Sequence, residues 1–520
     1  MAIPTRRFPW LSNRRKTAPE LPLEPPIFLG DKSNGEFYHR QTAAEARLRA
    51  AILGDSAQHA RRLGVDRREF LASAAGMAAS LWAINLASGC GGGGSGGYAV
   101  PPPGSIDCDQ AGGLLAGDEF ILDLQTHHVE DEEIWRTRHP DQNFGTVNSL
   151  AQFLTFYNCN STGDERWKCV GPATYLEQIF LNSDTSVAVL SGLPSPMCDD
   201  GTLCTNVNSN EGMAYWRDFF NEHAGGSQRV VQHCQVAPND RWDLQSEMMQ
   251  QVRENLGNHG WKCYPPWGPN GQGWWLDDEA ISVPFIERAR ELGEPLICAH
   301  KGFPLPGFDH EHTDPKDVGP IAARYPDVNF VIYHSAYLSN HIEGPYDPLN
   351  PGPAVDRLVQ TVDQHRLKGK NVYAELGSAW ALAMGNAVGA QHLIGKLLKY
   401  VGEDNVLWGS ECVWFGSPQR QIEAFRRLTI SEEFQERYGS PALTPERKAK
   451  IFGLNGAKLY GIDPEAKRCE IASNPLTVAK ARLDGELGAR RWAFQEPFGP
   501  TSRREFLALQ RWRRHINRPA

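Results

Sequence analysis

Short runs of β-branched and other apolar residues alternate with amphipathic stretches along the chain from about residue 118 onward. Eight runs have the length and composition of buried strands, at 119–125, 186–191, 229–236, 260–264, 295–300, 329–334, 371–376 and 405–411. Apolar residues recur at helical spacing over 315–325, 354–365, 390–401 and 418–427. Strands that alternate with helices pair in parallel, so the pattern predicts a closed (β/α)₈ TIM barrel. A doubly wound open sheet is the alternative.

Side chains that carry chemistry stand at the carboxyl ends of four of these runs. They are Gln125, His127, His128, His300, His334 and Glu411. In a barrel the carboxyl ends of all strands lie on one face, where barrel enzymes have their active sites. Imidazoles and carboxylates from several strands are the ligands of a divalent ion such as Zn²⁺, which keeps one position open for water. A single buried histidine more often serves packing, so the prediction of a metal site depends on all four strands.

The same segments resemble the amidohydrolase superfamily, in the amidohydrolase-related branch that includes the aminocarboxymuconate-semialdehyde decarboxylase type. The resemblance covers about 118–463 and depends on five motifs in this order: LDLQTH at 122–127, LICAH at 296–300, RYPDVNFVIYH at 324–334, VLWGSE at 406–411 and NGAKLYG at 455–461. It implies the barrel fold and a metal-dependent enzyme.

The resemblance also implies a role for each residue at the strand ends. Gln125 and His127 take the places of the two first-strand histidines, His300 that of the fifth-strand ligand, His334 that of the sixth-strand histidine, and Glu411 that of the eighth-strand aspartate. We expect His127, His300, Gln125 and Glu411 to be metal ligands, with zinc as the ion. Gln125 and Glu411 depart from the family pattern, and an amide oxygen is a poorer ligand for zinc than imidazole. We therefore expect the ion to sit in a different position from that in the family, to bind more weakly, or to be absent.

The implied mechanism is hydrolysis of an amide, lactone or related carbonyl bond in a small molecule. A divalent ion lowers the pKa of bound water to about 7, Glu411 takes the water proton, and His334 stabilises the oxyanion. The first alternative is a non-oxidative decarboxylase of an aromatic or unsaturated acid, because decarboxylating members use the ion to hold the substrate carboxylate. A second alternative is a binding protein on a barrel whose metal site has decayed.

Three further residues are predicted to contact the substrate. Trp267 follows the fourth strand in a stretch rich in Trp and Pro, and Trp414 follows the eighth strand. Both are expected to line an aromatic pocket, although capping of the barrel explains them equally well. Lys262 on the fourth strand is expected to bind a substrate carboxylate. A structural ion pair and a carbamylated bridge between two metals are the other interpretations of this lysine.

The first 90 residues predict a targeting segment rather than a catalytic domain. Residues 1–65 are rich in Arg and are expected to form a disordered leader. Residues 66–90 contain an Arg pair, then Phe-Leu and an uncharged stretch at 70–89, which resembles a twin-arginine signal. The stretch ends at Cys90 in a sequence like a lipoprotein cleavage site. We expect export by the twin-arginine machinery and a lipid anchor on Cys90; an uncleaved membrane anchor and a buried Ala-rich helix are the alternatives.

The remaining segments complete the expected organisation. A Gly- and Pro-rich linker spans 91–117, the barrel spans 118–463, and a helical extension spans 464–520 and packs on the barrel or on a second subunit of a homodimer. The net charge of −9 gives no electrostatic basis for nucleic-acid binding. Candidate disulfides are Cys159–Cys169 and Cys198–Cys204, and the expected buried thiols are Cys234, Cys263, Cys298 and Cys412.

Overall fold

Parallel strands form the centre of the molecule. The structure, a computed structural model, describes residues 24–27, 29, 32–33, 38–89, 96–130, 170–199, 201, 203, 208–269, 271–305, 308–339 and 341–487. The barrel strands are β4 (Leu122–Thr126), β5 (Val187–Leu190), β6 (Val230–Gln232), β7 (Cys234–Gln235), β8 (Trp261–Cys263), β9 (Leu296–His300), β10 (Asn329–Tyr333), β11 (Val372–Glu375) and β12 (Val406–Leu407). Each of the eight runs predicted as strands overlaps at least one of these segments.

The strands pair in chain order and close into a barrel. One sheet has the order β4-β5-β6 and the other the order β7-β8-β9-β10-β11-β12, with parallel pairing throughout. Only His233 separates β6 from β7, so the two are halves of one run. The last strand meets the first, because the Leu124 N–H donates to the Trp408 carbonyl at 3.1 Å and the Glu411 N–H donates to the Gln125 carbonyl at 2.8 Å. The TIM barrel is confirmed.

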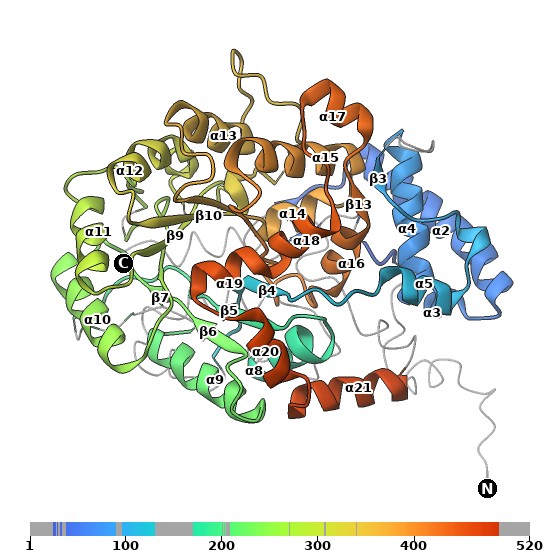
Figure 1. Cartoon of the computed structure of the whole chain (residues 1–520), viewed down its shortest axis with the longest axis horizontal. Helices are drawn as coiled ribbons and strands as arrows, with labels where there is room; N and C mark the ends of the chain where they lie inside the picture. The colour runs from blue at the N-terminus through green and yellow to red at the C-terminus, as the bar shows by residue number, and fades with distance from the viewer. Residues whose placement is uncertain are drawn as a thin grey trace, which may run out of the picture.

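Helices surround the strands (Figure 1). They are α8 (Pro172–Leu176), α9 (Asn210–His223), α10 (Trp242–Asn255), α11 (Ser282–Glu291), α12 (Val318–Arg324), α13 (Val355–Gln364), α14 (Gly377–Ala383), α15 (Ala387–Lys396), α16 (Gln419–Arg427), α17 (Glu432–Tyr438), α18 (Pro445–Ala449) and α19 (Asn455–Tyr460). In α13 the buried residues Val355, Leu358, Val359 and Val362 repeat at helical spacing and form one apolar face. Such faces cover the outside of the barrel.

The barrel interior is filled by side chains from alternating strand positions. Leu122 and Leu124 of β4 pack there with Cys298 of β9 and Val331 and Tyr333 of β10. Because side chains alternate along a strand, His300 shares the inward face of Cys298. The register of β4 against β5 shifts between Asp123 and Thr126. A shift of this kind re-aims the side chains that follow it, which explains how β4 sends both Leu124 and Gln125 inward.

A group of helices at the N-terminal end packs against one side of the barrel (Figure 1). It contains α2 (Ala43–Leu63), α3 (Arg67–Ala72), α4 (Ala74–Ala87) and α5 (Cys108–Leu115), with β3 (Gly97–Tyr98) paired to β13 (Leu428–Thr429) and β1 (Lys32–Ser33) paired to β2 (Tyr38–His39). The expected disorder over 1–65 is therefore wrong for α2. Thr42 and Glu45 form a capping box and Gly64 ends the helix in the left-handed conformation, so local signals favour this helix at both ends.

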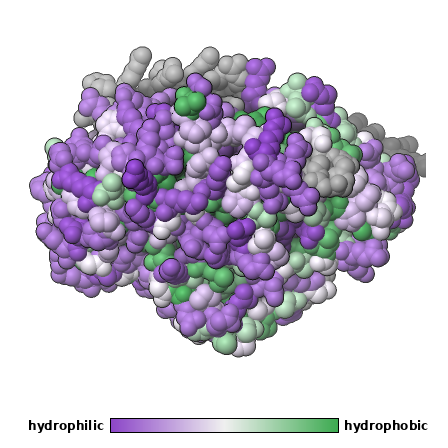
Figure 2. Space-filling model, turned by 45° about the horizontal axis from the view of Figure 1, so that its top comes forward, coloured by the Kyte–Doolittle hydropathy of each residue, from purple (hydrophilic) through white to green (hydrophobic). Residues whose placement is uncertain are grey.

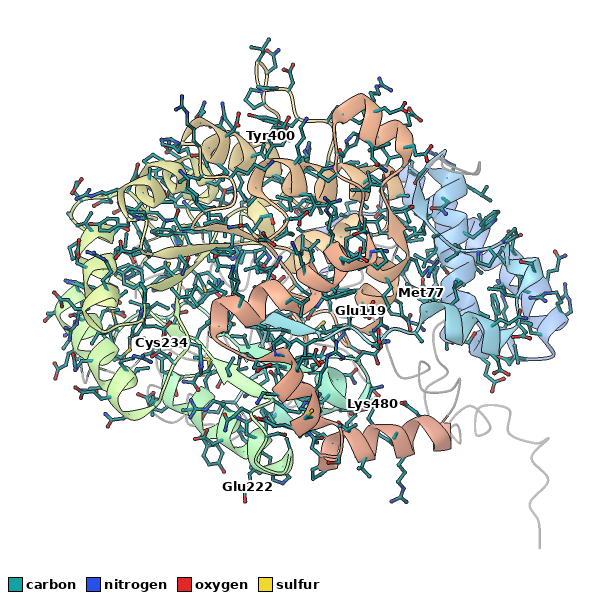
Figure 3. The ribbon with its side chains drawn as sticks, viewed as in Figure 1. Met77, Glu119, Glu222, Cys234, Tyr400 and Lys480 are labelled. Atoms are coloured by element: carbon teal, nitrogen blue, oxygen red, sulfur yellow. The ribbon has the colours of Figure 1, made fainter. Side chains whose placement is uncertain are left out.

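The uncharged stretch 70–89 is divided between α3 and α4, which meet at Ser73. Met77, Ala78, Leu81 and Ile84 of α4 are fully buried; Met77 is labelled in Figure 3. No helix in the described part of the chain has both the length and the apolar character needed to cross a bilayer. Cys90 and residues 91–95 lie outside the described residues, so the predicted lipidation falls there.

Helices α20 (Pro464–Ile471) and α21 (Pro475–Leu487) follow the barrel, as the helical pattern predicts. Lys480 of α21 lies 3.3 Å from Asp184, which links this helix to the loop before β5 (Figure 3). Residues 488–520 lie outside the described part of the chain. The face of the molecule in Figure 2 is largely hydrophilic, with apolar side chains scattered among polar ones.

Cysteine usage follows the prediction where it is described. Cys234, Cys263, Cys298 and Cys412 are buried free thiols. Cys198 is disulfide-bonded to a cysteine outside the described residues. Cys159, Cys169 and Cys204 all lie outside the described residues, so the two candidate pairings stay predictions.

Candidate active site

Three of the predicted residues meet at the carboxyl ends of β4, β10 and β12. The Gln125 amide nitrogen donates to Glu411 Oε1 at 3.3 Å, and His334 Nε2 lies 3.6 Å from the same oxygen. The Ser378 N–H donates to His334 Nδ1 at 3.3 Å, so the ring proton of the neutral imidazole is on Nε2 and points toward Glu411. Burial, with nearby His300 and Lys262, holds the pKa of His334 well below its ordinary value. Glu411 is therefore approached by two neutral donors.

His127 stands beside this group with one nitrogen unused. Its Nδ1 lies 2.8 Å from the Ser191 carbonyl oxygen, which can only accept, so Nδ1 carries the proton. Burial lowers the pKa of His127 to about 3. The buried Nε2 then presents a lone pair and has no hydrogen-bond partner among the described residues. The ring stacks on Trp414 at a centroid distance of 5.5 Å, which places Trp414 beside His127.

His300 is held between aromatic rings. It stacks on Tyr264 at 5.3 Å and meets the His334 ring edge to face at 4.8 Å. Its Nε2 donates to the Phe303 carbonyl at 3.3 Å, which leaves the lone pair on Nδ1. Burial, followed by the charge of Lys262, lowers the pKa of His300 to about 3.

The backbone is strained where these side chains are presented. His334, Ser335 and Ala336 all have positive φ angles, of 59°, 50° and 60°, and Glu411 has a φ of 58°. Residues with a Cβ rarely adopt this conformation, and such residues cluster at functional sites because surrounding contacts must hold them there.

Lys262 supplies the one cation among the described residues of this group. The side chain is fully buried, and Nζ lies 3.8 Å from the Tyr333 ring centroid and 4.3 Å from that of Tyr264. Nζ has no hydrogen-bond partner in the described structure. Desolvation lowers the pKa of Lys262 to about 8, against the opposing effect of Glu375 and Glu411 among others.

Residues behind the site hold these groups in place. The His334 N–H donates to Glu375 Oε2 at 2.9 Å, and burial raises the pKa of Glu375 to about 8. The Ser410 N–H donates to Asp123 Oδ1 at 2.9 Å, which fixes the backbone before Glu411. Burial raises the pKa of Asp123 to about 7.

The side chains at the strand ends could hold a divalent ion only if the amide of Gln125 is one of the ligands. No group of three or more His, Cys, Asp and Glu side chains in the described part of the chain is placed to hold a metal. Gln125 Oε1 and His127 Nε2, however, are buried without hydrogen-bond partners among the described residues, and Glu411 lies beside Gln125. One imidazole, one amide oxygen and one carboxylate are a mixed set, and two oxygens to one nitrogen favour a harder ion than zinc, such as Mn²⁺.

Two predicted residues lie apart from this group. His128 packs against Tyr175 at 5.4 Å and Phe220 at 5.8 Å, and no hydrogen bond in the described part of the chain joins its side chain to that of Gln125. Its side chain points away because successive residues of an extended chain face opposite sides. Trp267 is half-buried and makes no ring contact with the site among the described residues; its backbone N–H donates to the Tyr264 carbonyl at 2.9 Å, and its carbonyl accepts from the Asn239 amide at 3.0 Å.

Sequence reasoning missed Tyr333 and Gly377. Tyr264 belongs to the Trp- and Pro-rich stretch that was expected to line an aromatic pocket, and it is two residues beyond Lys262, the spacing at which strand side chains share a face. Gly377 has a φ of 35°, and a Cβ there would lie 2.6 Å from Gln125 Oε1 and 2.8 Å from His334 Nδ1. No local pattern marks this glycine, since its neighbours come from two other strands.

Comparison with known proteins identifies a family whose sequence model matches this chain. The sequence model of the family described as Amidohydrolase matches residues 200–462, just over half of the chain. No curated protein matches at a significant level.

Similar solved structures include three decarboxylases. A 2,6-dihydroxybenzoate decarboxylase from Rhizobium is 15% identical, with 66% of this chain and 99% of that chain covered and a TM-score of 0.39. A 5-carboxyvanillate decarboxylase from Sphingomonas paucimobilis is 12% identical, with 66% and 100% covered and a TM-score of 0.42. A dihydroxybenzoic acid decarboxylase from Polaromonas sp. JS666, solved with bound manganese and the inhibitor 2-nitroresorcinol, is 16% identical, with 66% and 97% covered and a TM-score of 0.38.

The implied membership is thus confirmed at the level of the family. The motifs at 296–300, 324–334, 406–411 and 455–461 all lie inside the matched range, and the motif at 122–127 lies before it. The chain belongs to the amidohydrolase family.

Proposed function

We propose that this protein is a non-oxidative decarboxylase of a small aromatic or unsaturated acid. The observation that carries the proposal is Lys262, a buried ammonium group with no hydrogen-bond partner among the described residues, between the rings of Tyr264 and Tyr333. A buried cation is costly unless it is paired, so a site of this kind favours a ligand that brings a negative charge.

The rings define the rest of the ligand. Tyr264, Tyr333 and Trp414 place flat apolar surfaces next to the site, and aromatic rings stack favourably on one another. A carboxylate attached to a ring or to a conjugated chain satisfies both features. An uncharged amide or lactone leaves the ammonium group of Lys262 unpaired, which is why decarboxylation is preferred here over the hydrolysis first expected.

A divalent cation bound at this site would be held by His127 Nε2, Gln125 Oε1 and Glu411. It would supply a fixed positive charge that orients and polarises a substrate oxygen. Metal analysis of the purified protein, followed by reloading with Mn²⁺ or Zn²⁺, distinguishes the ion favoured by the oxygen donors from the zinc first predicted.

The residues of the chain would then move one proton. In its protonated form Glu411 delivers a proton to the carbon that bears the carboxylate, the bond to the carboxyl carbon breaks with its electron pair returning to the ring, and Glu411 regains a proton from solvent. The balance is R–COO⁻ plus H⁺ giving R–H plus CO₂. His334, which approaches Glu411 Oε1 at 3.6 Å, orients the carboxyl group and is neutral, so it does not compete as the acid.

The test is release of CO₂ from a panel of hydroxybenzoates and unsaturated acids, beside esters, lactones and anilides as hydrolase substrates. We expect turnover of acids only, and Lys262→Met to lower kcat/KM by about 100-fold, the cost of one lost charged contact. Thermal unfolding of the variant controls for folding. Hydrolysis without CO₂ release contradicts the proposal and supports the hydrolase. Binding of the acids without turnover also contradicts it and supports the binding protein.

We also propose export of the folded protein by the twin-arginine route, supported by the sequence pattern at 66–90. Replacement of both arginines by lysine, Arg67→Lys with Arg68→Lys, keeps the charge and is expected to retain the protein in the cytoplasm. Fractionation of cells measures this, and mass spectrometry of the exported protein shows whether it begins at a lipidated Cys90. Unchanged export of the double variant contradicts the proposal.

A further inference from the structure

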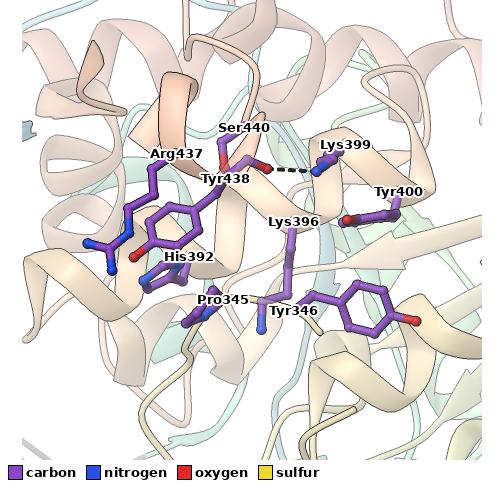
Figure 4. A pocket seen from close by; sticks show the side chains of 9 residues that line it. All are labelled: Pro345, Tyr346, His392, Lys396, Lys399, Tyr400, Arg437, Tyr438 and Ser440. Atoms are coloured by element: carbon purple, nitrogen blue, oxygen red, sulfur yellow. Dashed lines mark hydrogen bonds between the residues drawn. The ribbon is translucent and has the colours of Figure 1, made fainter. Parts of the chain in front are cut away.

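A polar pocket of about 200 Å³ lies outside the barrel, and none of the candidate active-site residues lines it (Figure 4). Its lining residues are Pro345, Tyr346, His392, Lys396, Lys399, Tyr400, Arg437, Tyr438 and Ser440. They come from α15 and the turn after it, from α17 and its end, and from the loop before α13. The volume is below the range typical of sites for drug-sized ligands, which restricts the occupant to a small molecule.

The pocket contains two cations that no buried carboxylate neutralises. Lys399 makes no ion pair in the described structure; its Nζ donates one hydrogen bond, to the Tyr438 carbonyl at 2.7 Å, and has two protons left. The Arg437 side chain is 66% exposed and reaches the equally exposed Glu433 only at 3.8 Å, a contact worth little in water.

Lys396 differs from these two cations. Its ammonium group contacts Glu343 at 2.5 Å and also Asp356, and all three side chains are nearly or fully buried. This lysine is therefore committed to the fold. His392 adds no charge, because burial, followed by the charges of Lys396 and Arg437, lowers its pKa to about 4.

Aromatic rings flank each free cation. Lys399 Nζ lies 4.8 Å from the ring centroid of Tyr400, and the Arg437 guanidinium lies 5.2 Å from that of Tyr438. Tyr346 meets Tyr400 edge to face at 4.9 Å. Figure 4 shows Arg437 and Tyr438 on one side of the pocket and Lys399 and Tyr400 on the other. Both sides thus combine a positive charge with a flat ring.

We propose that this pocket binds a small aromatic anion, with its ring against the tyrosines and its carboxylate or phosphate between Lys399 and Arg437. Two cations that lack buried partners attract a charged oxygen group, and hydrogen bonds to charged groups are the stronger ones. Phenol rings give the ring of the ligand an edge or a face to pack on. The inference is independent of the proposed decarboxylase, since it uses none of the residues of that site.

The test is calorimetric titration of the full chain carrying Lys262→Met, so that the candidate active site contributes no carboxylate binding. Phenyl phosphate and benzoate are the probes, and the tighter of the two identifies the anionic group. We expect one saturable event that Lys399→Gln or Arg437→Gln weakens about tenfold each, the loss of one charged hydrogen bond. Lys399→Arg keeps the charge and is expected to keep the affinity.

The matched control is Lys368→Gln, which removes an exposed lysine outside the pocket and is expected to leave binding unchanged. Thermal unfolding of Lys399→Gln shows whether loss of the Tyr438 contact disturbs the end of α17. The proposal is overturned by the absence of saturable binding of either probe, by equal affinities of the Lys262→Met protein with and without each charge substitution, or by benzamide or inorganic phosphate binding as tightly as phenyl phosphate. Each of these outcomes leaves CO₂ release by the candidate active site untouched.

Discussion

At the scale of single residues, the backbone of Gly377 lies against three polar atoms of the candidate site. A Cβ at this position would lie 2.6 Å from Gln125 Oε1 and 2.8 Å from both Glu375 Oε2 and His334 Nδ1. None of these groups is at the end of a flexible exposed chain, so they would have to move. The site therefore depends on the lack of a side chain here.

We predict that Gly377→Ala lowers kcat by at least about tenfold, because displacement of the reacting groups by a fraction of an ångström misaligns them. Steady-state kinetics measures this. Gly293→Ala is the matched control, since Gly293 also has a positive φ, of 69°, but no atom within 4 Å of its added Cβ. Equal effects of the two substitutions would show that backbone strain alone is responsible.

The ammonium group of Lys262 also gives the activity a pH dependence. Desolvation lowers its pKa to about 8, so the cation is present below that pH and is lost as the pH rises through it. We predict that kcat/KM for an acid substrate falls above about pH 8. In Lys262→Arg the fall in kcat/KM is expected only above about pH 10, since arginine stays charged. A fall at the same pH in both proteins would mean that another group titrates there.

At the scale of elements, strand and helix positions followed from local pattern, whereas the role of the N-terminal stretch did not. The eight apolar runs matched strands because buried parallel strands need continuous apolar residues. Stretch 70–89 is rich in Ala, Ser and Gly, which suits both a signal segment and a helix that packs closely on neighbours. Only contacts with distant residues distinguish the two, such as the Asn85 amide, which donates to the Tyr98 carbonyl at 2.6 Å.

These contacts predict the result of a truncation. Removal of residues 1–89 takes away α2, α3 and α4, whose buried side chains include Phe70, Leu81 and Ile84. It also leaves the Tyr98 N–H without the Asn85 side chain that accepts it at 2.8 Å. We expect the melting temperature to fall by at least about 5 °C.

The control is removal of residues 1–23, which precede the described residues and are expected to contribute little. Scanning calorimetry of the three proteins makes the comparison. If the protein that lacks 1–89 has the same melting temperature as the full chain, the helices are dispensable for stability, as is required of a signal that is cleaved.

At the scale of the whole molecule, buried neutral histidines link stability to pH. Burial lowers the pKa to about 3 in His127 and His300 and to about 4 in His128. In the unfolded chain these rings have a pKa of about 6.5. Below that pH the unfolded state binds protons that the folded state does not, so stability is complete above it and is lost as the pH falls.

We predict that the free energy of unfolding decreases by about 2 kcal/mol per histidine between pH 7 and pH 5. Urea unfolding at a series of pH values measures it. His128→Phe, which suits the aromatic surroundings of Tyr175 and Phe220, is expected to reduce the slope by about one proton. A slope unchanged by this substitution would mean that other groups take up the protons.

The sequence by itself determined the barrel, the strand ends and the residues that stand there. These depend on side-chain alternation, on the period of apolar residues and on motifs within a few positions of one another. That is why Gln125, His127, His300, His334 and Glu411 could be named in advance. Their identities, including the amide in place of an imidazole, needed no structure.

Only the tertiary structure decided which of these side chains act on one another. Gln125 and Glu411 are 286 positions apart, and their contact at 3.3 Å exists because the barrel closes. Folding also leaves Lys262 between two rings without a hydrogen-bond partner in the described residues, and it places Ser88 at the end of α4 within hydrogen-bond distance of Ala387 of α15. Such features depend on chain segments brought together by folding, and local pattern carries no information about them.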